Sequence, residues 1–231
     1  MKTRLEYIKE LRKRFAWVLI PSLFLLIVSF SQTPTLINYL LNYYEISAVS
    51  LSPAESISTS MNFAFAITMV FMIPALIYQM FAFSKDIIPK KDYKGILTKS
   101  IIGIVFASVG FVIGITFFGK LILNGMMMYN IGTPMWSVAS ILKLTALFGL
   151  AIAISIQMLW FIPLITKLDL LTKERLKKAR PFLFIGILII SALITPPDFM
   201  SMGLMVLPLY GSFEGGLFLS KNIREYEEIK C

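Results

Sequence analysis

The chain has 231 residues, of which 57% are hydrophobic, and its mean hydropathy is +0.79. Water-soluble domains of this size are much less apolar, so the composition predicts an integral membrane protein. The formal charge is +9, and the chain contains no histidine and a single cysteine, Cys231. This inventory excludes histidine-based zinc and haem sites, Ser/His/Asp triads and disulfide frameworks, so we expect no metal and no cofactor.

The first apolar stretch covers residues 15–31 and follows a basic leader of 14 residues. No small-residue cleavage site follows it, so it predicts a retained first span rather than a signal peptide. Residues 32–56 are predicted to be a polar and aromatic connection, in which the segment NYLLNYY favours a helix lying in the membrane interface. The second span is predicted over residues 57–83, ending in aromatic residues at the headgroup level.

Two more spans are predicted over residues 98–118 and 141–165, separated by a loop over residues 120–140. The third span contains small residues that allow neighbouring helices to approach closely. These are Gly103, Gly110 and Gly114.

The last two apolar segments, residues 181–195 and 203–219, are short for membrane spans. Their 15 and 17 residues would form helices about 22 and 25 Å long at ~1.5 Å per residue, against a hydrocarbon core roughly 30 Å thick. Pro196 and Pro197 mark either a tight turn between two short spans or the tip of one re-entrant hairpin. The basic segments on both sides favour two short spans.

Lysine and arginine are distributed unevenly among the connections. Twenty of the 22 basic residues lie in the N-terminal leader, in the 84–99 and 166–180 loops and in the tail from Lys221, whereas the alternate connections hold Lys120 and Lys143. The positive-inside rule therefore places both termini in the cytoplasm. We predict an all-α integral membrane protein, a single domain over residues 1–231 with six transmembrane helices, the last two short. Because the basic residues adjoin apolar segments, membrane lipids rather than nucleic acid are the expected partner of this charge.

Polar side chains within the predicted spans are the first candidates for function, because a membrane buries them at high cost. Glu214 lies in the last span, and the alternative to a functional role is that it packs against a helix end or backbone donors. Gln157 in the fourth span is expected to hydrogen-bond between helices, and Asp198 after the two prolines suits a helix cap. None of these residues forms a nucleophile–base pair, so we do not expect an enzyme. They leave open a small solute or ion transporter that uses Glu214 and Gln157, or a scaffold without a specific ligand.

Six short segments, in this order and spacing, resemble the TatC family, the core membrane subunit of the twin-arginine protein translocase. The similarity covers about residues 5–221, and each segment alone is a weak signal. The segments are ELRKR at 10–14, LSPAE at 51–55, PALIYQMFAF at 74–83, the pair FG at 148–149 with the basic run that ends in Arg180 and Pro181, TPPDFMS at 195–201, and PLY with FE at 208–214.

The resemblance implies a function and partners. TatC-like proteins are multi-pass proteins of the cell membrane that bind the twin-arginine signal peptides of folded cargo. They assemble with single-span TatA/TatB-type subunits and with other TatC copies. Export by this family is driven by the proton-motive force, and the chain accordingly has no nucleotide-binding P-loop.

The resemblance also implies a signal-peptide site made of Glu10, Arg12, Phe83 and Asp92, although Asp92 is one methylene shorter than the glutamate usual there. On spacing alone, Glu10 and Arg12 are equally compatible with solvated charges of a basic leader. The residue types suit the ligand, because arginine favours carboxylates, which accept its hydrogen bonds in pairs, and aromatic faces for stacking. If the first two spans pack side by side, Glu10, Phe83 and Asp92 can line one shallow pocket.

A second group of residues matches family positions for subunit contacts or other functional polar groups. Gln157 is the residue nearest to a fourth-span glutamate that the family has and this chain lacks. The group is Pro53, Glu55, Gln157, Asp198 and Glu214.

Overall fold

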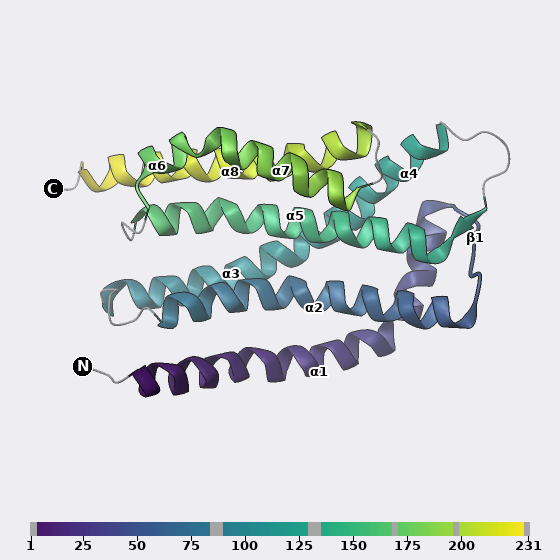
Figure 1. Ribbon diagram of the computed structural model, residues 1–231, viewed down its shortest axis with the longest axis horizontal. Helices are drawn as coiled ribbons and strands as arrows, with labels where there is room; N and C mark the ends of the chain where they lie inside the picture. Colours follow the sequence, from purple (N-terminus) through teal and green to yellow (C-terminus); the bar gives the residue numbers. More distant parts are fainter. Residues whose placement is uncertain (1–3, 84–89, 129–134, 168–170, 196–198, 229–231) are drawn as a thin grey trace. The chain divides into compact units, whose positions relative to one another are not determined.

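The computed structural model describes residues 4–83, 90–128, 135–167, 171–195 and 199–228, and nearly all of them are helical (Figure 1). This confirms the predicted all-α class. Two strands of two residues, β1 (Ala48–Val49) and β2 (Trp136–Ser137), form a parallel pair that the sequence did not predict. The helices are α1 (Arg4–Tyr44), α2 (Pro53–Phe83), α3 (Lys90–Ile113), α4 (Gly119–Met128), α5 (Val138–Lys167), α6 (Lys173–Lys178), α7 (Arg180–Ile194) and α8 (Phe199–Glu228), and a π-helical turn, η2 (Gly114–Phe118), joins α3 to α4.

The chain forms two compact units whose segments alternate along the sequence. The amino-terminal unit comprises Met1–Ser108 and Pro134–Lys143, and the carboxy-terminal unit comprises Val109–Thr133 and Leu144–Cys231. The boundaries fall inside α3 and α5, so each of these helices contributes residues to both units.

In the amino-terminal unit, α1 and α2 pack side by side and run antiparallel (Figure 1). The predicted end of the first span at residue 31 is wrong as a helix end, because α1 is a single helix of 41 residues that continues to Tyr44. The helix predicted around NYLLNYY is confirmed as helical, but it is the last part of α1. α1 bends along its length (Figure 1), and it contains Pro21 and Pro34. Proline explains such a bend, because it removes a ladder hydrogen bond and its ring crowds the preceding turn.

Backbone geometry ends α1 at Tyr44. The next residue, Glu45, has a φ of 59°, in the left-handed region that non-glycine residues seldom adopt. The N–H of Glu45 donates to the carbonyl of Asn42 at 3.2 Å, and the N–H of Ile46 donates to the carbonyl of Leu41 at 3.5 Å. These two bonds make a Schellman motif, which turns the chain out of the helix toward β1.

α2 begins at Pro53, before the predicted start of the second span at residue 57. Ser52 caps the helix, because its Oγ accepts a hydrogen bond from the N–H of Glu55 at 3.2 Å. Proline suits the first helical position, where its missing N–H has no partner in any case. The segment Ser-Pro-Ala-Glu therefore carried a helix-start signal that hydropathy alone does not reveal.

The predicted loop over residues 120–140 is wrong in its first half, because helical structure continues through η2 and α4 to Met128. The close packing predicted for Gly110 and Gly114 is confirmed. A Cβ at Gly114 would lie 2.6 Å from the Cα of Gly149 on α5, and one at Gly110 would lie 2.6 Å from the Cδ1 of Ile156. The absence of a side chain at Gly114 thus lets the backbones of η2 and α5 touch.

The carboxy-terminal unit is built around two apolar clusters, in which Figure 1 shows α7 and α8 as antiparallel neighbours. The first cluster joins four helices and the second joins the other ends of α5 and α8. Their buried members are Ile122, Phe148, Ala151, Ile187, Met205 and Leu209 in the first, and Ile162, Phe213 and Leu217 in the second.

Five stretches among the described residues are long and apolar enough to cross a membrane. The last of them, Phe199–Ser220, has 22 residues, so the prediction of a short final span is wrong, and a re-entrant hairpin is disfavoured. α7, with 15 residues, is a shorter apolar helix. It agrees with the predicted short fifth span, while the count of six spans stays a prediction. The other four stretches are Arg12–Tyr44, Pro53–Gln79, Ile101–Met128 and Val138–Lys167.

Candidate functional site

The residues predicted to bind a signal peptide belong to three helices of the amino-terminal unit. Glu10 and Arg12 lie in α1, Phe83 is the last residue of α2, and Asp92 is the third residue of α3. Figure 1 shows the N-terminal end of α1, the end of α2 and the start of α3 at the same end of this unit. The side chain of Arg12 is exposed. Those of Glu10, Phe83 and Asp92 lie outside the described part of the structure, so their shared pocket stays a prediction.

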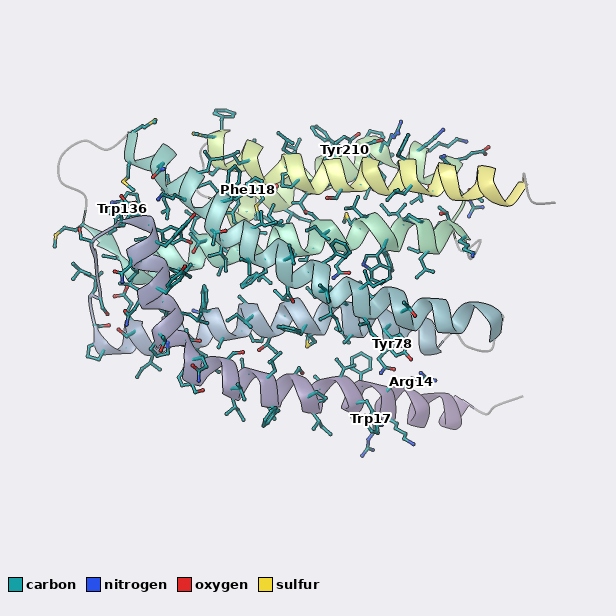
Figure 2. All side chains as sticks on the ribbon, turned by 180° about the vertical axis from the view of Figure 1, so that it is seen from behind. Arg14, Trp17, Tyr78, Phe118, Trp136 and Tyr210 are labelled. Atoms are coloured by element: carbon teal, nitrogen blue, oxygen red, sulfur yellow. The ribbon has the colours of Figure 1, made fainter. Side chains whose placement is uncertain are left out.

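The packing of α1 on α2 extends to this end of the unit. Arg14 on α1 is half-buried, and Figure 2 shows it near Tyr78 of α2, while Trp17 points away from the helix pair. The 68% exposure of Trp17 agrees with that view. The side-by-side arrangement of the first two spans, on which the predicted pocket depends, is therefore confirmed.

The carboxylate of Glu55 joins three segments of the amino-terminal unit. Its Oε2 accepts a hydrogen bond from the N–H of Leu51 at 2.6 Å. Its Oε1 accepts hydrogen bonds from the hydroxyl of Ser137 and from the N–H of Ala139, the latter at 3.3 Å. Ser137 also pairs with Val49 in the β1–β2 ladder. Glu55 thus ties the start of α2 to β2 and to the start of α5.

This arrangement gives Pro53 and Glu55 a structural role inside the chain. Pro53 opens α2, and Glu55 lies in its first turn, where a negative charge is favoured by the helix dipole. The hydrogen bonds of Glu55 hold two connections that are distant in sequence. The family-based expectation that these residues also contact other subunits stays a prediction.

Glu214 has two partners within the carboxy-terminal unit. Nη2 of Arg180 donates to its Oε2 at 2.6 Å, and the hydroxyl of Tyr210 donates to its Oε1 at 3.1 Å. The side chains of Arg180 and Glu214 are 41% and 34% exposed, so the ion pair is only partly desolvated. Arg180 is the first residue of α7, so Glu214 lies beside a helix end. Both partners are side chains rather than backbone donors, so a functional role for Glu214 stays a prediction.

Aromatic contacts fix Tyr210, which is labelled in Figure 2. Its ring meets the ring of Phe184 on α7 edge-on, with centroids 5.2 Å apart, and the ring of Phe213 lies 6.2 Å away. The edge-to-face contact with Phe184 is attractive at this distance, and the ring of Phe213 is tilted against that of Tyr210. These contacts hold the ring in place while its hydroxyl reaches Glu214.

Gln157 is buried in α5, and its Oε1 accepts a hydrogen bond from the indole N–H of Trp160. This partner is one turn away on the same helix, so a bond between helices stays a prediction. Asp198 lies outside the described residues, as does its predicted role as a cap. Within the described part of the chain, no group of three His, Cys, Asp or Glu residues is placed to hold a metal ion.

The sequence did not predict three partners of the polar residues: Ser137, Arg180 and Tyr210. Tyr210 precedes Glu214 by four residues, a spacing that puts both on one helix face, so a local signal existed. Arg180 is 34 residues from Glu214, and Ser137 is 82 residues from Glu55. No local pattern links residues so far apart.

Known proteins resemble this chain in both sequence and fold. The family model described as Sec-independent protein translocase protein (TatC) matches residues 6–208. The chain is 27% identical to Sec-independent protein translocase protein TatCy of Bacillus subtilis (strain 168), over 94% of this chain and 88% of that protein. It is 26% identical to Sec-independent protein translocase protein TatC of Escherichia coli (strain K12), over 75% of this chain and 68% of that protein. A crystal structure of the twin-arginine translocase receptor TatC in DDM shares the fold, with a TM-score of 0.81 and 21% identity over 93% of this chain and 99% of that chain.

Proposed function

Because the chain belongs to the TatC family of Sec-independent protein translocase proteins, we propose that it binds twin-arginine signal peptides at one end of its amino-terminal unit. Family membership itself makes the chain a multi-pass membrane component of a protein translocase, a transport subunit rather than an enzyme. This family assignment takes the place of the two alternative functions, a solute transporter and a scaffold without a specific ligand, that the polar residues alone left open.

The antiparallel packing of α1 on α2 is the observation that supports this site most directly. It puts the part of α1 that contains Glu10 and Arg12 at the same end as the last turn of α2 and the first turn of α3 (Figure 1). Phe83 closes α2 and Asp92 lies in that first turn of α3. Two acids and an aromatic residue therefore come from three helix ends that lie at one end of the unit.

The chemistry of these residues suits a pair of arginines. Each guanidinium group can donate two parallel hydrogen bonds to a carboxylate and can stack on an aromatic face. Glu10 and Asp92 would each receive one arginine, and Phe83 would offer its ring. Lysines flank both acids in the sequence: Lys9 and Lys13 near Glu10, and Lys90 and Lys91 near Asp92. Their charge repels isolated cations, so a peptide that engages both acids at once is preferred.

The remaining parts of the proposal follow the family. Both termini and the peptide site face the cytoplasm, where the positive-inside rule places 20 of the 22 basic residues. The chain assembles with TatA/TatB-type subunits and with copies of itself, and export uses the proton-motive force. Pro53, Glu55, Gln157, Asp198 and Glu214 are the polar residues proposed to support that assembly.

Single substitutions of the two acids test the peptide site. A charge-assisted hydrogen bond contributes roughly 1.5–3 kcal/mol, so losing one should weaken peptide binding about tenfold to a hundredfold. Asp92→Asn and Glu10→Gln should therefore reduce crosslinking of a twin-arginine signal peptide to the purified protein in detergent. Asp92→Glu should preserve it, because it restores the family residue.

Two controls make this result specific. Glu174→Gln removes an exposed carboxylate from α6, outside the proposed site, and should leave crosslinking unchanged. A twin-lysine peptide should crosslink weakly to the parent protein. If Asp92→Lys binds the twin-arginine peptide as well as the parent does, Asp92 is not part of the recognition site.

A further inference from the structure

α6 is a short basic helix that a single apolar side chain anchors to the carboxy-terminal unit. Its sequence is KERLKK, and Leu176 packs against the cluster of Ile162, Phe213 and Leu217. The contact holds α6 against α5 and α8. Of the other side chains of α6, those at 174, 175, 177 and 178 are exposed, and Lys173 is partly exposed. The anchor therefore presents the charged side chains outward.

The outward charge of α6 is not neutralised by the neighbouring ion pair. The helix carries four basic residues, here called the basic patch, and one carboxylate, Glu174. The basic patch consists of Lys173, Arg175, Lys177 and Lys178. Arg180 follows directly, but Glu214 already holds it at 2.6 Å. Counting only the side chains that the structure describes, a net positive charge thus remains at the junction of α6 and α7.

An apolar stripe on α7 starts next to the basic patch. The stripe consists of Phe182, Ile185, Ile189 and Leu193, whose spacing puts them on one face of the helix. Their side chains are 78%, 54%, 55% and 81% exposed. The stripe runs for about 16 Å at ~1.5 Å per residue. The first residue of the stripe, Phe182, follows the last residue of the basic patch, Lys178, by four positions, so the charged and the apolar surfaces are close along the chain.

We propose that the basic patch and the α7 stripe together bind one anionic phospholipid. The phosphate of the headgroup lies on the basic patch, and an acyl chain lies along the stripe. Charge complementarity selects the lipid, because basic residues at a membrane surface attract anionic headgroups, whereas a zwitterionic headgroup carries its own compensating cation. A helix of another protein would cover the stripe but would leave the patch without a counter-charge, which favours the lipid as occupant.

Native mass spectrometry of the purified full chain in detergent tests this proposal. Phosphatidylglycerol should be retained in preference to phosphatidylcholine with the same acyl chains. Lys177→Gln with Lys178→Gln should weaken retention roughly thirtyfold, from the attraction of two basic residues to an anionic surface. Lys120→Gln with Lys143→Gln is the matched control, since it removes two positive charges from other helices. It should retain the lipid as the parent does.

A second set of measurements separates the lipid from other anions. Glycerol phosphate, which shares the headgroup chemistry but has no acyl chain, should not displace the lipid at millimolar concentration. Ile185→Ser with Ile189→Ser should weaken lipid retention, because the stripe loses its apolar character.

Four results would overturn the proposal: equal retention of both lipids, equal loss in the two lysine double variants, displacement by glycerol phosphate, or displacement by an acidic peptide. Crosslinking of the twin-arginine peptide should be the same in the Lys177/Lys178 variant and the parent. The proposal of a lipid site and the proposal of a peptide site can therefore be supported or overturned independently of each other.

Discussion

Glu214 has two side-chain partners, Arg180 and Tyr210, and removing either member of its ion pair should lower the stability of the protein. Arg180→Leu leaves a partly desolvated carboxylate without its ion-pair partner, and Glu214→Leu does the same to the guanidinium group. Because both side chains are more than a third exposed, each change should lower the free energy of unfolding by about 1 kcal/mol. Glu214→Gln, which keeps the shape, should cost less.

The double variant of Arg180 and Glu214 shows whether the two losses have one cause. If the ion pair is responsible, the double variant should be no less stable in detergent than either single variant. Losses that simply add would show that the two residues act independently. Native gels of the assembled complex give a separate readout, and if Glu214→Leu assembles as well as the parent, Glu214 is not a subunit contact.

Glu45 holds a backbone conformation that suits glycine better. Its φ of 59° brings the side chain close to its own backbone. Glu45→Gly should therefore raise the free energy of unfolding by about 1 kcal/mol, measured by thermal unfolding in detergent. Glu45→Ala removes the carboxylate but keeps the Cβ, so it should give no such gain. If both variants are stabilised equally, the side chain rather than the backbone is the cause.

At the scale of single residues, the sequence singled out polar residues but did not predict their partners. Glu214 stood out because apolar residues surround it, and Glu55 because it matches a position of the family. Their partners Ser137 and Arg180 are set by tertiary packing, which brings together residues 82 and 34 positions apart. Hydropathy and spacing carry no information about such pairs.

At the scale of single helices, the contact of η2 with α5 leaves no room for a side chain. A Cβ at Gly114 would lie 2.6 Å from the Cα of Gly149, so one of the two backbones would have to move. Gly114→Ala should lower the free energy of unfolding by about 1–3 kcal/mol, as overpacked positions do. Thermal unfolding in detergent is the measurement.

Gly211 on α8 is the matched control for this change. A Cβ there meets no atom within 4 Å, so Gly211→Ala should be neutral or slightly stabilising. Equal losses at both positions would mean that glycine matters for helix flexibility and not for close approach.

Hydropathy predicted where apolar helices lie, but not where they end. The fourth span was placed correctly, since α5 covers residues 138–167. Helical structure runs beyond the predicted ends at residues 31 and 118, because a helix can continue through polar residues and, as at Pro34, through a proline that bends it. The start of α2 at Pro53 had a local signal in Ser52 and Glu55, which a search for capping residues would have found.

At the scale of the whole molecule, orientation in the membrane is open to a direct test. Cys231 is the only cysteine of the chain and lies in the C-terminal tail, which holds three of the 22 basic residues. If the positive-inside rule holds, a membrane-impermeant maleimide should label Cys231 only after the cells are permeabilised. A cysteine introduced at Met135, which is 83% exposed in the amino-terminal unit, should be labelled in intact cells when combined with Cys231→Ser. The reverse pattern would invert the proposed topology.

Because segments of the two units alternate along the chain, the amino-terminal unit becomes complete only after part of the carboxy-terminal unit has been synthesised. Glu55 leaves the ribosome 82 residues before its partner Ser137, and β1 likewise waits for β2. When translation has reached residue 133, the amino-terminal unit still lacks Pro134–Lys143, and most of the other unit has not been made. A nascent chain of that length must hold α1 and α2 in place without the ladder that later secures them. For the same reason, no single cut in the polypeptide can separate the two units into whole fragments.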